Sequence, residues 1–120
     1  MKPLEWIGSA KDDLLDLPSD VQNVMGYGLY LAQIGDKYDE AKPLKGFKGA
    51  GVLEIVDNFD SDTYRAVYTV KFESAVYVLH VFQKKSKSGI ATPKPDIDLI
   101  ERRLKVAQEH HRSNYDNRQN

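Results

Sequence analysis

The sequence predicts an α+β fold in which a twisted antiparallel sheet carries two N-terminal helices and one C-terminal helix. Three observations favour this class. Apolar residues recur at helical spacing in the N-terminal third, three segments rich in Val, Tyr and Thr follow in the middle, and an amphipathic segment comes last. The chain has 120 residues, the size of one ordinary domain, so we expect a single domain over residues 1–120.

The N-terminal third is expected to form a short strand and two helices. Residues 4–7 alternate between apolar and polar side chains, as a strand does. A short helix is expected over 9–17, because a serine can cap it and two aspartates follow in its first turn, and a longer helix is expected over 19–34. Gly26 and Gly28 each weaken the longer helix by roughly 1 kcal/mol relative to alanine. We therefore expect both glycines where that helix packs closely on the sheet.

The middle of the chain is expected to form a β-meander. A loop over 35–51 leads to three strand-like segments, Val52–Phe59, Thr63–Phe72 and Ala75–Gln83, which short polar turns separate. Helices that pack together on one face of this curved sheet leave the opposite face uncovered. We expect that uncovered face to meet a ligand.

The C-terminal segment is expected to be one amphipathic helix. Residues 84–92 form a basic loop, and Thr92 followed by Pro93 is typical of a helix start. The apolar residues that follow recur on one helical face to about residue 111. Residues 112–120 are expected to be a frayed tail.

The composition excludes several classes of protein. Cysteine is absent, which excludes disulfides, thiolate zinc sites and cysteine nucleophiles. No apolar run approaches the ~20 residues that span a bilayer. The N-terminal residues include Pro3 and Glu5, where a signal peptide needs a long apolar stretch. We therefore expect a cytoplasmic protein that makes no use of a membrane.

The net charge of −1 conceals an uneven distribution. Residues 1–40 carry eight acidic side chains and three lysines, whereas residues 41–95 carry nine basic side chains and five acidic ones. This asymmetry suggests one surface for a polyanion and another for a different partner. The alternative interpretation is ordinary solvated charge.

The strongest candidate site combines Arg65 in the second meander strand with Lys84 and Lys85 at the end of the third. A slip of one residue in strand register exchanges the two faces of a strand. Because the two lysines are consecutive, one of them shares the face of Arg65 in either register. Several cations close together suit a phosphodiester, and Lys45, Lys48 and Lys87 add to them. Alternatively, lysines at a strand end only improve solubility and prevent edge-to-edge aggregation.

Histidines and tyrosines give weaker signals. His80 lies alone in a strand, so it is either a packed residue or a general base. His110 and His111 lack a suitably spaced third ligand, so we expect no metal site. The tyrosines at 64, 68 and 77 are expected mainly in the core, although one that faced a cleft would be able to stack on a base. No cofactor is indicated.

Three blocks of sequence together resemble a known family. They are residues 42–55 (KPLKGFKGAGVLEI), 64–68 (YRAVY) and 79–87 (LHVFQKKSK). In this order they are similar to the phage-derived, HigB-like branch of the RelE/ParE toxin superfamily, and the resemblance covers nearly all of residues 3–111. It implies a RelE-like fold and the toxin of a type II toxin–antitoxin pair. The implied partner is a helix-turn-helix antitoxin, with which the toxin forms a hetero-oligomer.

The resemblance also implies an activity. HigB- and RelE-type members cleave messenger RNA on the ribosome, without a metal, by attack of the RNA 2′-hydroxyl on the adjacent phosphorus. The implied catalytic residues are Arg65 and the pair Lys84 and Lys85. Contacts to RNA are implied for the side chains of Lys45, Lys48, Lys87 and His80. Either His80 or a tyrosine is a candidate for the general acid.

Two other activities stay open at this stage. ParE-type members of the superfamily inhibit DNA gyrase, and a phage-derived member can also be a binding module without catalysis. One departure bears on the choice between these activities. Val56 stands where many relatives carry an arginine, so catalytic roles do not transfer one by one from the family pattern.

Overall fold

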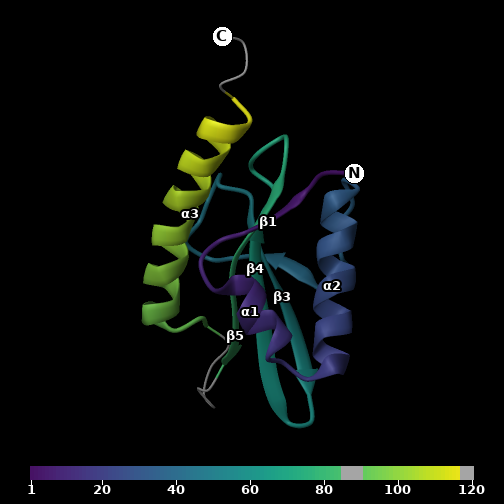
Figure 1. The fold of residues 1–120 in the computed structure, drawn as a ribbon. Coiled ribbons are helices and arrows are strands. Elements are labelled where there is room, and N and C mark those ends of the chain that lie inside the picture. Colours follow the sequence, from purple (N-terminus) through teal and green to yellow (C-terminus); the bar gives the residue numbers. More distant parts are fainter. Residues whose placement is uncertain (85–90, 117–120) are drawn as a thin grey trace.

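The computed structural model describes residues 1–84 and 91–116, which form three layers (Figure 1). A five-stranded sheet lies in the middle, with α1 and α2 on one face and α3 on the other. In chain order the elements are β1 (Leu4–Trp6), α1 (Ala10–Leu15), α2 (Ser19–Gln33), β2 (Ala41–Pro43), β3 (Val52–Phe59), β4 (Asp62–Thr69), β5 (Val76–Lys84) and α3 (Lys94–Asn114). The α+β class and the two N-terminal and one C-terminal helices are confirmed.

The sheet has the strand order β1-β5-β4-β3-β2. Strands β2 to β5 pair antiparallel, as the meander predicts, whereas β1 adds to β5 in parallel. The sheet is therefore mixed at one edge. The other edge strand, β2, lies inside the segment 35–51 that was expected to be loop. Its sequence Ala-Lys-Pro has no β-branched or aromatic residue, so strand propensity gives no signal there.

Strand boundaries differ from the predicted ones at β4. This strand ends at Thr69, not at Phe72. The Thr69 hydroxyl donates a hydrogen bond of 2.9 Å to the carbonyl oxygen of Ala50 and accepts one of 3.0 Å from the Lys71 backbone N–H. A threonine side chain that bonds the backbone two residues on favours a turn over a continuing ladder.

The expectation of an uncovered sheet face is wrong, because α3 packs across it. Buried Ile100 and Ala107 of α3 belong to the same apolar cluster as Tyr77 and Leu79 of β5. The second cluster lies on the opposite face and joins α1 and α2 to the sheet through Val21, Met25, Leu29, Ile55, Tyr68 and Val78. The sheet thus separates two apolar cores. α3 lies over β5, whereas on the same face Val56 of β3 is half-buried and Asn58 is exposed.

α3 continues to Asn114, beyond the predicted end near residue 111. His111 is buried there, and its ring stacks between the rings of Phe72 and Tyr115, with centroid distances of 4.9 and 5.0 Å. This packing holds the last turn against the sheet. Residues 112–114 are therefore helical, and 117–120 lie outside the described residues.

Gly28 is where α2 approaches the sheet most closely. A Cβ atom at this position would lie 2.5 Å from Cδ1 of buried Ile55, so the expectation for Gly28 is confirmed. Gly26 is exposed, and a Cβ there would meet nothing within 4 Å, so the expectation for Gly26 is wrong. Neither α2 nor any other helix in the described part of the chain is long and apolar enough to cross a membrane.

One β-bulge determines which side chains of β5 face α3. Val67 pairs with His80, but the next residue, Tyr68, pairs with Val78, so Leu79 is an extra residue in β5. Simple alternation from Tyr77 would turn His80 toward α1 and α2. The extra residue turns it toward α3 instead, on the same face as Leu79.

Candidate functional site

A group of polar side chains surrounds Arg65 on the face of the sheet that α3 covers. The strand register places Glu54 and His80 in one row, on either side of Val67, and Lys84 in another row, opposite Thr63. Arg65 lies on β4 between these two rows, so all three side chains are its diagonal neighbours. We call this group, with Thr92 and Asp96 at the start of α3, the Arg65 cluster.

The guanidinium of Arg65 is tied to a carboxylate. Its Nη1 donates to Oε1 of Glu54 at 2.6 Å and to the Thr92 hydroxyl at 3.3 Å. Only 6% of the Arg65 side chain and 13% of the Glu54 side chain are exposed. The expectation that this arginine lies on an open face is therefore wrong, because α3 and the segment before it close over the sheet. A phosphate would have to replace Glu54 and Thr92 to reach Nη1.

His80 has an acidic partner. Its Nε2 lies 2.8 Å from Oδ1 of Asp96, which is in the first turn of α3, and its ring stacks on Phe82 with a centroid distance of 4.4 Å. The ring is buried, and its Nδ1 makes no hydrogen bond within residues 1–84 and 91–116. One nitrogen of the ring is thus oriented by a carboxylate, and the other has no hydrogen-bonding partner among the described residues.

The predicted lysines lie in different places. Lys84 ends β5, is buried and shares the face of Arg65, whereas Lys85 and Lys87 lie outside the described residues. Lys45 and Lys48 are exposed in the loop between β2 and β3. That loop pairs with Val52, which lies two residues along β3 from Glu54 and six residues from the row of Lys84. The loop that carries Lys45 and Lys48 is therefore nearer to Glu54 than to Lys84.

The three tyrosines are not part of the Arg65 cluster. Tyr64 and Tyr68 belong to the core beneath α1 and α2, and burial raises the pKa of Tyr68 to about 12. Tyr77 faces α3 and its hydroxyl lies 2.7 Å from Nδ1 of His110. Burial also raises the pKa of Tyr77, so both phenols stay neutral near pH 7.

Sequence reasoning missed three members of the cluster: Glu54, Thr92 and Asp96. The signal for Glu54 was available, because a hairpin that turns at residues 60 and 61 places Glu54 diagonally opposite Arg65. Opposite charges at such positions attract each other across a sheet. Asp96 gave no comparable signal, since its contact with His80 depends on how α3 returns to the sheet.

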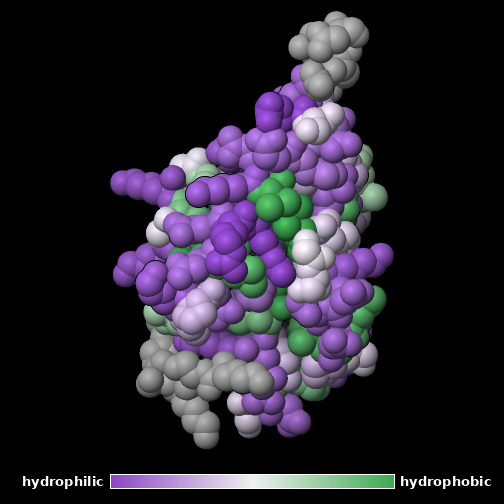
Figure 2. Space-filling model, turned by 60° about the vertical axis from the view of Figure 1, so that its left-hand side comes forward, coloured by the Kyte–Doolittle hydropathy of each residue, from purple (hydrophilic) through white to green (hydrophobic). Residues whose placement is uncertain are grey.

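The chemistry of the cluster is that of acid–base groups beside cations. A carboxylate, an oriented imidazole, a guanidinium and an ammonium group suit proton transfer at a centre that carries developing negative charge, such as a phosphodiester. No group of three His, Asp or Glu side chains in the described part of the chain has the geometry to hold a metal ion. The outer surface on the side of the molecule that carries α3 is largely hydrophilic, with smaller apolar patches between (Figure 2).

A comparison with models of protein families gives a match over most of the chain. The model of the family described as phage-derived protein Gp49-like (DUF891) matches residues 12–105. The match runs from α1 into α3 and includes every member of the Arg65 cluster. No curated protein matches the chain.

Proposed function

Since the chain belongs to the phage-derived Gp49-like family, a family of RelE-type, toxin-like proteins, we propose that it is the toxin of a type II toxin–antitoxin pair and that it cleaves messenger RNA on the ribosome. One observation carries the proposal of cleavage. Glu54, His80 and Lys84 all border Arg65 on one sheet face, so a proton acceptor, a proton donor and two cations lie around a single point.

The proposed reaction is transfer of a phosphoryl group within the RNA. The Glu54 carboxylate takes the proton of the 2′-hydroxyl, and the 2′-oxygen forms a bond to the adjacent phosphorus. The bond from phosphorus to the 5′-oxygen breaks as protonated His80 gives a proton to that oxygen from Nδ1. The products are a 2′,3′-cyclic phosphate and a 5′-hydroxyl. Arg65 and Lys84 stabilise the charge on the phosphoryl oxygens.

The proposed reaction starts when the Arg65 guanidinium exchanges its partners. In the closed arrangement Glu54 and Thr92 hold the guanidinium, so an entering phosphate displaces both. The displaced carboxylate is then free to act as the base. We propose that the described structure is the resting state and that residues at the start of α3 move when RNA binds.

Inducible expression of the chain tests the proposal. We expect growth arrest, shortened messages and new 5′-hydroxyl ends on cleaved RNA. Arg65→Ala and His80→Gln should each reduce cleavage by roughly 10²–10³-fold. Lys105→Ala, which removes an exposed lysine from α3, is the matched control and should cleave normally. Because Arg65 is buried, thermal unfolding of each variant must show that the fold is retained. Arrest with intact messages contradicts the proposal.

One observation favours a second candidate, a toxin that acts by binding alone. The Arg65 guanidinium is buried and its charge is compensated by Glu54, which is also the geometry of a structural ion pair. A ParE-like inhibitor of gyrase, or a binding module, needs the fold and does not need an accessible Arg65. Expression of a gyrase inhibitor induces DNA damage signalling, whereas expression of a binding module causes no growth arrest. In both cases Arg65 variants that fold keep the wild-type effect.

A further inference from the structure

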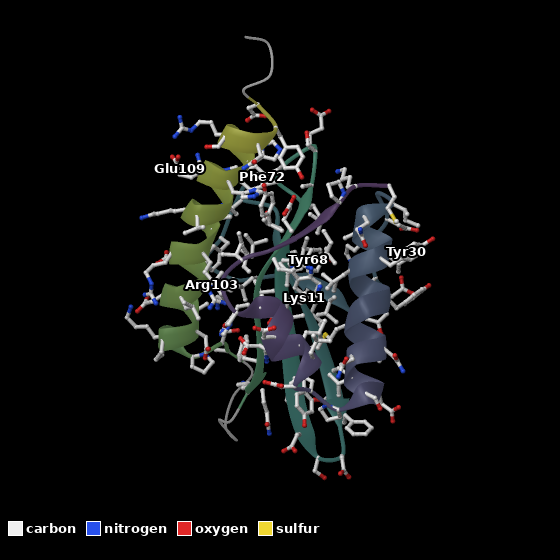
Figure 3. All side chains as sticks on the ribbon, in the orientation of Figure 1. Lys11, Tyr30, Tyr68, Phe72, Arg103 and Glu109 are labelled. Atoms are coloured by element: carbon white, nitrogen blue, oxygen red, sulfur yellow. The ribbon has the colours of Figure 1, made fainter. Side chains whose placement is uncertain are left out.

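The outer face of α2 has an unusual composition for a helix at the protein surface. Residues 21–34 contain no charged side chain, although α2 packs on the sheet with one side only. The outer side exposes Tyr27, Tyr30 and Ile34 to 55%, 46% and 48%. In Figure 3, Tyr30 points away from the sheet. A surface helix ordinarily carries charged residues on its outer face.

Gly26 lies within this same face. Asn23, Gly26, Tyr27, Tyr30 and Ile34 follow helical spacing, and we call them the α2 stripe. Gly26 is exposed, and the space where its Cβ would lie is open. Nothing within the described chain requires a glycine there, although alanine would stabilise the helix by roughly 1 kcal/mol. A notch without a side chain, beside two tyrosines, lets another helix approach closely.

The stripe leads into a hollow of about 550 Å³ at the C-terminal end of α2. Met1, Pro3 and Ile34 line part of it. Two hydrogen bonds preform this end: the Lys2 N–H donates to the Gln33 carbonyl oxygen at 3.0 Å, and Nε2 of Gln33 donates to the Lys2 carbonyl oxygen at 2.8 Å. The stripe thus ends, at Ile34, in a wide and open depression of the surface.

The charge around the stripe indicates what binds it. Residues 1–40 carry eight acidic side chains and three lysines, Lys2, Lys11 and Lys37. The end of the stripe at Asp20 is acidic, whereas at the other end Lys37 lies beside Asp36 and Lys2 lines the hollow. A second copy of the chain would bring together two segments that each have a net charge of −5, which is repulsive. A basic partner is complementary to this charge, above all at the Asp20 end.

We propose that the α2 stripe is the docking surface for an α-helix of the antitoxin, with apolar residues that cover Tyr27 and Tyr30 and with Lys or Arg beside Asp20. The inference rests on the proposed function in that the partner is the antitoxin. Exposed tyrosines beside a close-approach position are typical of the centre of an interface. The stripe and the Arg65 cluster lie on opposite sides of the sheet. The bound helix therefore does not contact the cluster, and neutralisation does not require contact with Arg65.

Binding of the full chain to the protein encoded by the adjacent reading frame tests the surface, with the dissociation constant measured at low and high salt. Tyr27→Ala and Tyr30→Ala should each weaken binding by roughly 30-fold, as loss of an interface hot spot does. Gly26→Leu, which fills the notch, should weaken it at least as much. Val106→Ala removes a side chain of similar exposure from α3 and should bind as the wild type does. Higher salt should weaken binding, because the attraction is between opposite charges.

Three outcomes overturn the inference: no complex with that protein, a complex insensitive to the α2 variants, or a homodimer that Gly26→Leu abolishes. Expression of each variant without the partner distinguishes a failure of the docking surface from a failure of the proposed function. If the α2 variants arrest growth as the wild type does but escape neutralisation, both proposals stand. If the wild type does not arrest growth, the proposed function fails, while the binding measurement still decides the surface. Thermal unfolding of the variants shows that the fold is unchanged.

Discussion

The carbonyl oxygen of Leu79, the extra residue of the β5 bulge, accepts a hydrogen bond of 3.0 Å from Nη1 of Arg103 in α3. β1 ends at Trp6, which pairs with Val78, so β1 supplies no residue opposite Leu79. The guanidinium also donates to the Ser9 hydroxyl at 3.1 Å, and burial lowers the pKa of Arg103. Figure 3 shows this side chain reaching from α3 toward the sheet. One arginine thus joins the bulge, α3 and the start of α1.

Loss of this side chain should destabilise the fold. Arg103→Ala removes a charged donor and leaves the Leu79 carbonyl without this bond, which costs about 1.5–3 kcal/mol. Urea unfolding should show a lower midpoint with an unchanged slope. Lys105→Ala, on the exposed side of the same helix, is the control and should change the free energy of unfolding by less than about 0.5 kcal/mol. Equal stability of the two variants would contradict the assigned role of Arg103.

The two glycines of α2 should respond in opposite directions to alanine. Gly28→Ala forces a Cβ against buried Ile55 and should lower the free energy of unfolding by about 1–3 kcal/mol. Gly26→Ala meets open space and should raise it by up to about 1 kcal/mol, because alanine is the better helix former. Thermal unfolding of the pair measures both effects in one helix. A destabilised Gly26→Ala variant would show that the described environment of Gly26 is wrong.

The free energy of unfolding should fall strongly when either Glu54 or Arg65 alone is replaced by an apolar residue. It should fall much less when both are replaced. Glu54→Leu leaves the buried guanidinium without this carboxylate and should cost about 3–5 kcal/mol. Combination with Arg65→Met should recover most of that loss, because two apolar side chains replace two charges. Denaturant unfolding of the single and double variants measures the coupling. The double variant also tests catalysis, since the proposal requires a stable fold without RNA cleavage.

Alkaline pH should destabilise the protein through Tyr68. Its pKa is raised by burial from 10.0 to about 12, so the unfolded chain releases this proton first. The stabilising contribution is complete below about pH 10 and is lost as the pH rises through about 12; the linkage is on the order of 1.4 kcal/mol per pKa unit. Tyr68→Phe should lose less stability between these pH values than the wild type, measured by urea unfolding. Tyr30→Phe, at an exposed tyrosine, is the control.

Local sequence patterns predicted most of the helices and strands, because these elements depend mainly on residues that are close together in the sequence. Val52–Phe59 forms a strand with the predicted bounds, and the helix expected over 19–34 ends one residue earlier, at Gln33. The coverage of both sheet faces was not predictable in this way. The apolar side of α3 fits either face of the sheet, and the choice depends on packing between residues far apart in the sequence, such as Tyr77 and Ala107.

The candidate site was predicted only in part, because some of its contacts depend on packing between residues far apart in the sequence. Arg65 and Lys84 lie on the same face of the sheet. This was expected, because one of two consecutive lysines must share the face of Arg65 in either strand register. The position of His80 could not be derived, because alternation along β5 fails at the bulge and no local residue pattern marks Leu79 as the extra residue. The closure over Arg65 was also missed, since Thr92 is 27 residues away from Arg65 and reaches it only through the return of α3.

The parallel pairing of β1 with β5 has a consequence for how the chain is made. Leu4 emerges from the ribosome long before Val76, its neighbour in the sheet. β1 therefore cannot pair until β5 has been synthesised. Contacts this distant in sequence form late in folding. Asp96 and Thr92 are synthesised later still, so a nascent chain has no complete Arg65 cluster until nearly all of its residues have been joined. A chain that ends before Thr92 therefore lacks both Asp96, the partner of His80, and Thr92, a partner of Arg65.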